Sequence, residues 1–398
     1  MAVDVEAAPA GLRELTGRRD VLRLFGSQLV GRLPIGMADL AIVLLVRQRG
    51  GSYALAGLLA GVMAISTAVS SPLLGRLSDR VGARVVVLTG AVLAAGAAIA
   101  FAITTTDHAT PASLAAALVL GAAEPPLSPC FRALLPDLVG RDRLHALYAI
   151  DSTTQELVFI TGPLIVVGVA SVSSIGVAVA SMSVLVLAGS VVFASAPTVR
   201  AAPRNQRRDA EGALRSSGLR TICVVVAVAM LGFGAVQVAV PAACEVSGSR
   251  TAAGYVMTIW AFGSLVGGFL YATSKLRGDA RTHLLICLCL NAAGTVACLI
   301  SPSPYALAAA LFCVGLVVAP AFSCVFVLVE RTAVGGSLTE AFSWIQSAFA
   351  GGFAAGSAVA GVLIDVSGWR LGFAFAAAAV LGAGVLSLAL RRFLVGVA

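Results

Sequence analysis

Long apolar stretches recur along almost the whole of this 398-residue chain, and they restrict its fold more than any other feature. Hydrophobic residues make up 59% of the sequence and charged residues only 12%. A soluble domain has too small a core to bury so much apolar sequence, so we expect the chain to lie in a lipid bilayer. Each run is long enough for a helix that crosses the hydrocarbon, which takes roughly 20 residues. The runs lack the alternation of membrane strands, which favours helices over a barrel.

The runs accommodate twelve membrane-spanning helices. They are expected at residues 21–46, 52–75, 84–106, 112–135, 145–170, 174–196, 220–244, 251–273, 282–301, 305–329, 339–364 and 370–390. The longest polar stretch, from Pro197 to Arg220, divides six spans from six. The predicted organisation is therefore a tail at 1–20, a six-helix bundle at 21–196, a linker at 197–219 and a second six-helix bundle at 220–392.

The basic residues are distributed unevenly between the two sides of the predicted membrane. With the N-terminus in the cytoplasm, most of the 27 Arg and Lys residues fall on the cytoplasmic side. The loops on the other side hold Arg47, Arg49, Arg250 and Arg370. This bias predicts that both termini are cytoplasmic. The net charge of +8 thus reports topology and indicates no nucleic-acid partner. A composition rich in Arg and Ala is typical of GC-rich bacterial genomes, so we expect the bacterial cytoplasmic membrane.

A short charged loop joins the second and third predicted spans. It reads Gly75-Arg76-Leu77-Ser78-Asp79-Arg80-Val81-Gly82-Ala83-Arg84. The pattern G-x-L-x-D-R-x-G-x-R resembles the signature loop of the major facilitator superfamily, which joins the same two helices. The resemblance covers essentially the whole chain, and it implies an all-α membrane protein with twelve transmembrane helices in two six-helix pseudo-repeats. An internal match supports the repeats, because a shift of 194 residues sets Pro126 on Pro320 and Gly162 on Gly356.

The same resemblance implies a gating role for this loop. Asp79 is expected to face the N-terminus of the eleventh helix near Leu338–Glu340, where the helix dipole favours a carboxylate. Arg80 is expected to pair with Asp137 at the end of the fourth helix. The residues expected to form this latch are Gly75, Asp79, Arg80, Gly82, Arg84 and Asp137. One departure is Ala83, where the family usually has a basic residue. The alternative is a charged turn that only fixes topology.

The fifth span carries Gly162-Pro163, which resembles the antiporter motif of the family. A proline inside a spanning helix bends it and leaves a carbonyl without its donor, which suits a gating helix. The glycine pattern of that motif is reduced here to Gly162 and Gly168. We therefore keep two interpretations, a step that supports antiport and a kink that serves packing.

Charged side chains inside the spans are candidates for function, because an ionisable group in the membrane is expensive. Arg32 and Asp39 lie seven residues apart in the first span, about 20° apart on one face and about 10 Å apart along the axis. First helices line the central cavity in this family, so a proton or substrate role follows from the resemblance. A structural charge that faces another helix is the alternative.

The fourth and fifth spans carry a second charged group. Glu124 and Glu156 lie at equal distances on either side of the turn near Gly140, so they are expected at similar depth. Two carboxylates at one depth would not both ionise easily, so one could carry a proton. Arg132 and Asp151 form a second layer nearer the cytoplasm. We predict that these four residues, with Asp39, couple transport to protons. A static ion-pair network is the alternative, and the five-residue spacing of Asp151 and Glu156 points them in different directions.

The second half is poorer in charge and richer in aromatic and amide side chains. The substrate-cavity candidates are Arg32, Gln237, Trp260, Phe322, Phe326, Trp344 and Gln346. Aromatic stripes can equally pack against helices or lipid. If they face the cavity, acids in one half and aromatics in the other suit an amphipathic organic molecule, a cation included. An anionic substrate is the alternative, because Arg32 and Arg132 could pair with its negative charge.

The sequence contains neither a G-x-x-x-x-G-K-[ST] nucleotide-binding loop nor a nucleophile–base pair, and it indicates no metal or other cofactor. We therefore predict a monomeric secondary active transporter, not an enzyme, whose partners are a small-molecule substrate, protons and the lipid bilayer. Proton-coupled efflux by alternating access is the first expectation. The alternatives are a metabolite importer or uniporter of the same fold, and a receptor or scaffold in the membrane that transports nothing.

Overall fold

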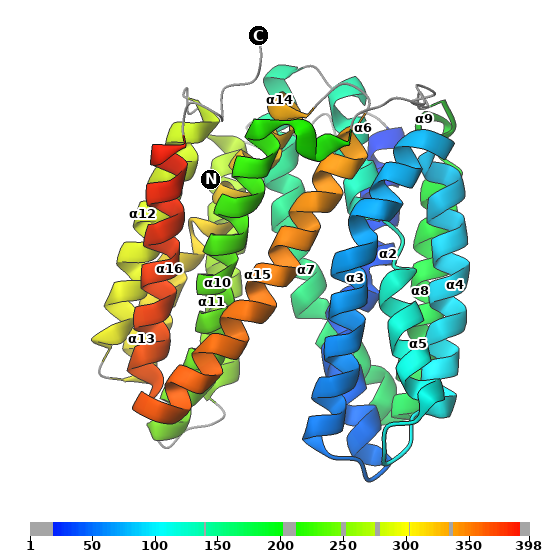
Figure 1. The fold of residues 1–398 in the computed structure, drawn as a ribbon, viewed down its shortest axis with the longest axis horizontal. Coiled ribbons are helices and arrows are strands. Elements are labelled where there is room, and N and C mark those ends of the chain that lie inside the picture. The colour runs from blue at the N-terminus through cyan, green and yellow to red at the C-terminus, as the bar shows by residue number, and fades with distance from the viewer. Residues whose placement is uncertain are drawn as a thin grey trace, which may run out of the picture.

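The computed structural model describes residues 19–138, 141–201, 212–247, 252–274, 279–301, 303–333 and 337–390. The regular structure of these residues is helical throughout (Figure 1). The first half contains α2 (Arg19–Gln48), α3 (Tyr53–Val81), α4 (Ala83–Thr104), α5 (Pro111–Ala122), α6 (Leu127–Leu138), α7 (Arg141–Val172) and α8 (Ile175–Ala194). The short helix α9 (Pro197–Ala201) and the 3-10 turn η2 (Ala213–Arg215) connect it to the second half. The second half contains α10 (Ser217–Val246), α11 (Ala252–Thr273), α12 (Ala280–Leu299), α13 (Pro304–Gly315), α14 (Val318–Thr332), α15 (Leu338–Ser367) and α16 (Trp369–Ala389).

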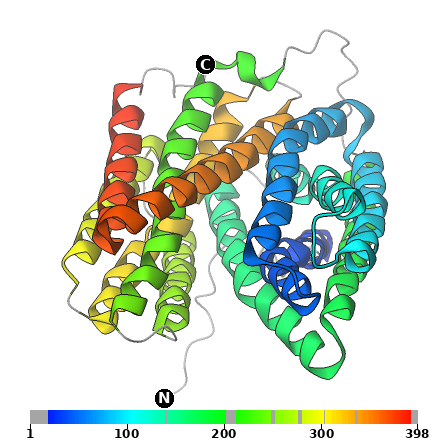
Figure 2. The ribbon, with the colours of Figure 1, turned by 60° about the horizontal axis from the view of Figure 1, so that its bottom comes forward.

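The spans predicted from the apolar runs are present as helices. Among the described residues, eleven segments are long and apolar enough to cross a membrane, or up to twelve if α2, with a 46° bend at residue 39, counts as one span. Helices α2–α8 form one bundle and α10–α16 form a second bundle beside it (Figures 1 and 2). The all-α, two-bundle membrane fold expected from the sequence is confirmed.

Two predicted spans are broken, where the sequence suggested continuous helices. The fourth is divided into α5 and α6 around Glu124, because the following Pro125 and Pro126 have no backbone N–H to donate. The tenth is divided into α13 and α14 at residues 316–317, and Pro320 lies in the first turn of α14 that follows. The breaks occupy corresponding positions in the two halves, which supports the internal repeat.

Close helix crossings in the first bundle depend on glycines. Gly162 of α7 lies directly against the backbone of Gly36 in α2, and Gly189 of α8 lies against Gly31. A Cβ at Gly162 would collide with the Gly36 backbone. Small residues that let backbones approach are the usual means of packing helices in lipid. The Gly162-Pro163 step is therefore part of the α2–α7 contact.

Candidate functional site

The charged loop between α3 and α4 contacts the second bundle, as the latch hypothesis expects. Asp79 accepts hydrogen bonds from the backbone N–H groups of Thr339 (3.3 Å) and Glu340 (2.9 Å) in the first turn of α15. The carboxylate thus satisfies two donors that a helix N-terminus leaves without partners. Gly75, one turn earlier, lies against Ser343 and the Thr339 carbonyl, where a Cβ would not fit. Arg76 adds a longer ion pair to Glu340 at 3.9 Å.

The other expected contact of this loop is absent. Arg80 and Asp137 are both exposed, and the ion pairs of the described residues include none between them. Two exposed side chains gain little from pairing in water, so they have no strong reason to meet. Gly82, with φ of +100°, ends α3 and begins α4, and Arg84 lies in the first turn of α4. The contacts of this loop region with the second bundle are therefore made by Asp79, Gly75 and Arg76.

Helices α3 and α15 meet near this loop and diverge toward their other ends (Figures 1 and 2). Two serine hydroxyl groups join these helices on the side close to the loop. Ser71 donates to the Ser343 carbonyl at 3.3 Å, and Ser347 donates to the Ala68 carbonyl at 2.6 Å. We call the end of the molecule where α3 meets α4 the loop end. The bundles are therefore closed against each other at the loop end.

Helix α7 makes a second contact between the bundles, also in the half nearer the loop end. The Ser152 hydroxyl donates to the Ala319 carbonyl of α14 at 3.0 Å. Thr153 lies against Gly268 of α11. One turn further on, the carboxylate of Glu156 accepts a hydrogen bond of 3.1 Å from the Ser264 hydroxyl of α11. Glu156 has no ion pair among the described residues. A carboxylate therefore lies in the contact that must open if the bundles separate at the loop end.

Asp151 directly precedes Ser152 in α7 and faces into the first bundle, away from Glu156, as its spacing predicts. It pairs with Arg132 of α6 at 2.6 Å and with Arg32 of α2 at 3.7 Å. Gln28 donates to the same carboxylate at 2.8 Å. Arg32 is 5% exposed and Arg132 is 1% exposed, and Asp151 and Gln28 are fully buried. The structure thus brings three of the predicted charged residues, Arg32, Arg132 and Asp151, into one network.

Glu124 lies at the break between α5 and α6, next to this network. Its carboxylate accepts a hydrogen bond of 3.3 Å from Thr67 of α3. It is close enough to Arg32 to attract its charge, but the described ion pairs include none between them. Asp39 falls in α2, and its side chain lies outside the described residues. The carboxylates of Glu124 and Glu156 are therefore hydrogen-bonded to hydroxyl groups, whereas the carboxylate of Asp151 is paired with two guanidinium groups.

Aromatic side chains connect the network to the second bundle. The guanidinium of Arg132 lies over the ring of Phe326 in α14, 3.8 Å from its centroid. Phe326 also packs edge-on against Tyr148 and Phe342, with ring centroids 6.0 Å and 6.1 Å apart. A cation over an aromatic face is attracted by the ring quadrupole. Of the aromatic cavity candidates, Phe326 therefore contacts the first bundle directly.

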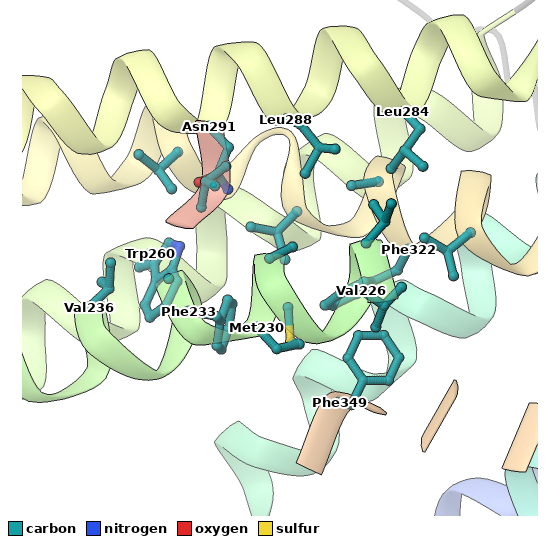
Figure 3. Close-up of a pocket in the computed structure, with 18 residues that line it drawn as sticks. Val226, Met230, Phe233, Val236, Trp260, Leu284, Leu288, Asn291, Phe322 and Phe349 are labelled. Carbon is teal, nitrogen blue, oxygen red and sulfur yellow. The ribbon is translucent and has the colours of Figure 1, made fainter. Parts of the chain in front are cut away.

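A cavity of about 60 Å³ lies inside the second bundle, one helical turn from Phe326 (Figure 3). Phe322, Phe349, Phe233 and Met230 line it, and Trp260 and Asn291 turn their polar groups into it (Figure 3). Two predicted cavity residues, Trp260 and Phe322, therefore share one pocket. The other candidates lie elsewhere: Gln237 is exposed, and Trp344 and Gln346 on α15 are half-buried outside this pocket.

Sequence reasoning missed three polar residues that complete these groups. Gln28 bonds Asp151, Thr67 bonds Glu124, and Ser264 bonds Glu156. Gln28 lies four residues before Arg32, on the same helix face, and that spacing was the one available signal. The two hydroxyl residues come from other helices, so nothing in the sequence marked them.

Comparisons with known proteins agree with this architecture. Residues 24–224 and 222–395 match the model of the Major Facilitator Superfamily. The human organic anion transporter MFSD10 (TETRAN) has a similar structure, with a TM-score of 0.75 and 17% identity over 96% of this chain and 100% of that chain. A bacterial homologue of the iron transporter ferroportin, solved in an outward-facing state, has a TM-score of 0.76 and 14% identity over 94% of this chain and 100% of that chain. At these identities the likeness concerns the fold alone. No curated protein sequence matches the chain.

Proposed function

This chain belongs to the Major Facilitator Superfamily, and from that premise we propose that it exports a small organic compound in exchange for protons by alternating access. The proposal places it in the bacterial cytoplasmic membrane with both termini in the cytoplasm, as the distribution of basic residues suggests. The loop end is then cytoplasmic. The closed contacts there, at Asp79 and at Glu156, correspond to a conformation that faces outward.

The hydrogen bond between Glu156 and Ser264 carries the proposal. Its carboxylate belongs to the first bundle and its hydroxyl to the second, so the bond breaks when the bundles part at the loop end. A buried carboxyl without a cation is more stable protonated, and a hydrated one more stable ionised. Glu156 would therefore hold a proton while the loop end is closed and release it to the cytoplasm when that end opens. A proton that moves inward in this way can drive export.

Glu124 is the second proton carrier of the proposal. It lies at a break in the fourth span, and its hydrogen-bond partner is Thr67 of α3, the helix that carries the latch. Broken helices at corresponding positions of two repeats are a common place for substrate and ion sites in transporters. The substrate would bind between the two breaks, near the place where Arg132 lies over Phe326 of α14.

The test uses the purified protein in liposomes that contain a pH-sensitive dye. Ethidium and 4-methoxyphenylacetate serve as a cationic and an anionic probe, and uptake of each is measured together with lumenal pH. Antiport predicts that the lumen becomes more alkaline as a probe enters. Acidification during uptake beyond that of protein-free liposomes, which the neutral form of the acid crosses unaided, would indicate a symporting importer, and uptake without any pH change a uniporter. Absence of substrate-dependent flux with a wider panel would favour the receptor or scaffold alternative.

The variant Glu156→Gln sharpens the test because it keeps the bond to Ser264 and removes the titratable proton. It is expected to reduce the number of protons moved per probe molecule, because only Glu124 can still carry one, while it leaves probe exchange at equal pH intact. Asp365→Asn is the matched control, since Asp365 is an exposed carboxylate at the far end of α15. Full proton-coupled transport by Glu156→Gln would contradict the proposed role of Glu156.

A further inference from the structure

The buried network of the first bundle contains more positive than negative charge. Arg32 and Arg132 are 5% and 1% exposed, and both are paired with the single carboxylate of Asp151. The next carboxylate, Glu124, forms its hydrogen bond with Thr67, and no described ion pair links it to an arginine. A buried charge is stable only when it is paired and hydrogen-bonded. When Glu124 carries the proton of the proposed function, the two arginines have only the charge of Asp151 between them, and the network can accept one further anion.

Arg32 is the more weakly paired of the two arginines. Arg132 donates to Asp151 at 2.6 Å and to Gln155 at 3.3 Å. Arg32 reaches Asp151 only at 3.7 Å and Gln28 only at 3.4 Å, and its Nε–H has no hydrogen-bond partner. A guanidinium has five N–H donors in a planar fork that suits a carboxylate. The fork of Arg32 therefore has donors left for a ligand.

The apolar cavity of the second bundle has the complementary property. Its walls are mostly aliphatic and aromatic, and they include Phe322 and Phe349, whose ring centroids are 4.9 Å apart. Trp260 is 6% exposed, yet its Nε1–H has no hydrogen-bond partner. The indole nitrogen and the amide of Asn291 both turn into the cavity (Figure 3). The cavity therefore suits a compact apolar group that carries a hydrogen-bond acceptor.

The two features adjoin each other through α14. Phe326 lies under the guanidinium of Arg132, and Phe322, one turn before it, lines the cavity. Because Arg32 and Arg132 share Asp151, a ligand between the bundles can thus place a negative group near the arginine pair and an apolar group near Phe322. We propose that the buried arginine pair and the cavity form one bipartite site for an amphipathic organic anion. The inference rests on the proposed transport function, and it specifies the charge and shape of the substrate.

The test compares three probes of one shape and different charge: 4-methoxyphenylacetate, 4-methoxyphenylacetamide and 4-methoxyphenethylammonium. Each is titrated calorimetrically into the full-length protein in lipid nanodiscs, with empty nanodiscs as the blank. We expect the anion to bind about 30-fold more tightly than the amide, as for a charge that gains a buried partner, and the cation to bind most weakly. Equal affinities, tighter binding of the cation, or no binding of any probe would overturn the proposal.

Variants then locate the two parts of the site. Arg32→Gln is expected to reduce the affinity for the anion to that for the amide, whereas Arg32→Lys keeps the preference. Arg23→Gln is the matched control, because Arg23 lies on the same helix, is exposed and bonds Ser195 outside the network. Trp260→Phe removes the indole N–H while it keeps an aromatic ring, though a smaller one, and should weaken all three probes by about fivefold, the effect of one hydrogen bond. An anion preference that survives Arg32→Gln would overturn the assignment.

The vesicle assay separates this inference from the proposed function. Ethidium uptake with lumenal alkalinisation, together with a cation preference in the titrations, would support proton antiport and refute the anion site. Anion preference without proton movement would support the site and refute the proton coupling.

Discussion

The two bundles have the same architecture but bury different chemistry. The first contains a charged network around Asp151, and the second contains an apolar cavity lined by Phe322 and Trp260. Their broken spans show the same contrast, since Glu124 lies at the first break and Leu316-Val317 at the second. The two halves of the repeat therefore have similar helices and different buried side chains; in the site we propose, the first bundle binds the charged group of the substrate and the second binds its apolar group.

The latch shows the same asymmetry. In the first half Asp79 caps the N-terminus of α15. At the corresponding place of the second half, a shift of 193 residues sets Ala272 on Asp79, so the carboxylate is lost. Closure at the loop end thus depends on one bundle reaching the helix terminus of the other. Four substitutions test this division between the bundles, from the largest expected effect to the smallest.

Asp151→Asn should have the largest effect, because it leaves Arg32 and Arg132 buried without their carboxylate. Loss of one partner from a buried ion pair destabilises a protein by about 3–5 kcal/mol. We expect a strongly lowered Tm in detergent or nanodiscs, measured by tryptophan fluorescence. Asp107→Asn is the control, since Asp107 is exposed in the α4–α5 loop. A loss below about 1 kcal/mol would show that the network is not the stabilising centre of the first bundle.

Gly75→Ala should disturb the latch next most strongly, because its Cβ would collide with Ser343 and the Thr339 carbonyl. Overpacking of this kind costs about 1–3 kcal/mol. The closed loop end should open, which can be measured as a longer distance between spin labels at the exposed residues Leu77 and Thr273. Gly61→Ala on the same helix is the control, because nothing lies within 4 Å of that Cβ position. Unchanged label distances in Gly75→Ala would refute the close contact.

Asp79→Asn tests the electrostatic part of the same contact. The amide retains one acceptor oxygen and loses the charge that favours the N-terminus of α15, a loss of about 1 kcal/mol. The open population measured with the same labels should rise about fivefold. Arg80→Gln should leave it unchanged, because Arg80 does not pair with Asp137. A larger effect of Arg80→Gln than of Asp79→Asn would restore the ion pair as the principal latch.

Ser264→Ala should have the smallest effect, because one neutral donor to Glu156 is worth about 0.5–1.5 kcal/mol. We expect the pH dependence of transport to shift while the maximal rate changes little. Ser357→Ala is the control, since this hydroxyl bonds the Gly234 carbonyl inside the second bundle. Identical pH profiles for Ser264→Ala and the unaltered protein would show that Glu156 takes no part in proton movement.

Much of the fold could be predicted from the sequence. Each span is an apolar run whose length is set by the bilayer, so helix positions follow from composition alone. The contact of Asp79 with α15 came from the resemblance of its loop to a known family. The breaks around Glu124 and before Pro320 were missed, because prolines within apolar runs are compatible with either a kink or an interruption.

Only the charged residues of the candidate site could be predicted from the sequence, and their partners could not. Arg32, Arg132 and Asp151 were visible as charges in apolar runs, but Gln28, Thr67 and Ser264 were not. The sequence also suggested an Arg80–Asp137 pair that two exposed side chains do not form. Hydroxyl and amide partners carry little hydropathy signal, so only their positions in space identify them.

The sequence by itself determined that the chain spans a membrane, where its helices run, and which end carries the charged loop, because burial in lipid requires long apolar segments and exposed charge between them. Only the tertiary structure decided that two arginines share Asp151 while Glu124 and Glu156 each bond a hydroxyl. Pairing depends on how helices cross and rotate, and these are set by side-chain packing between segments far apart in the chain.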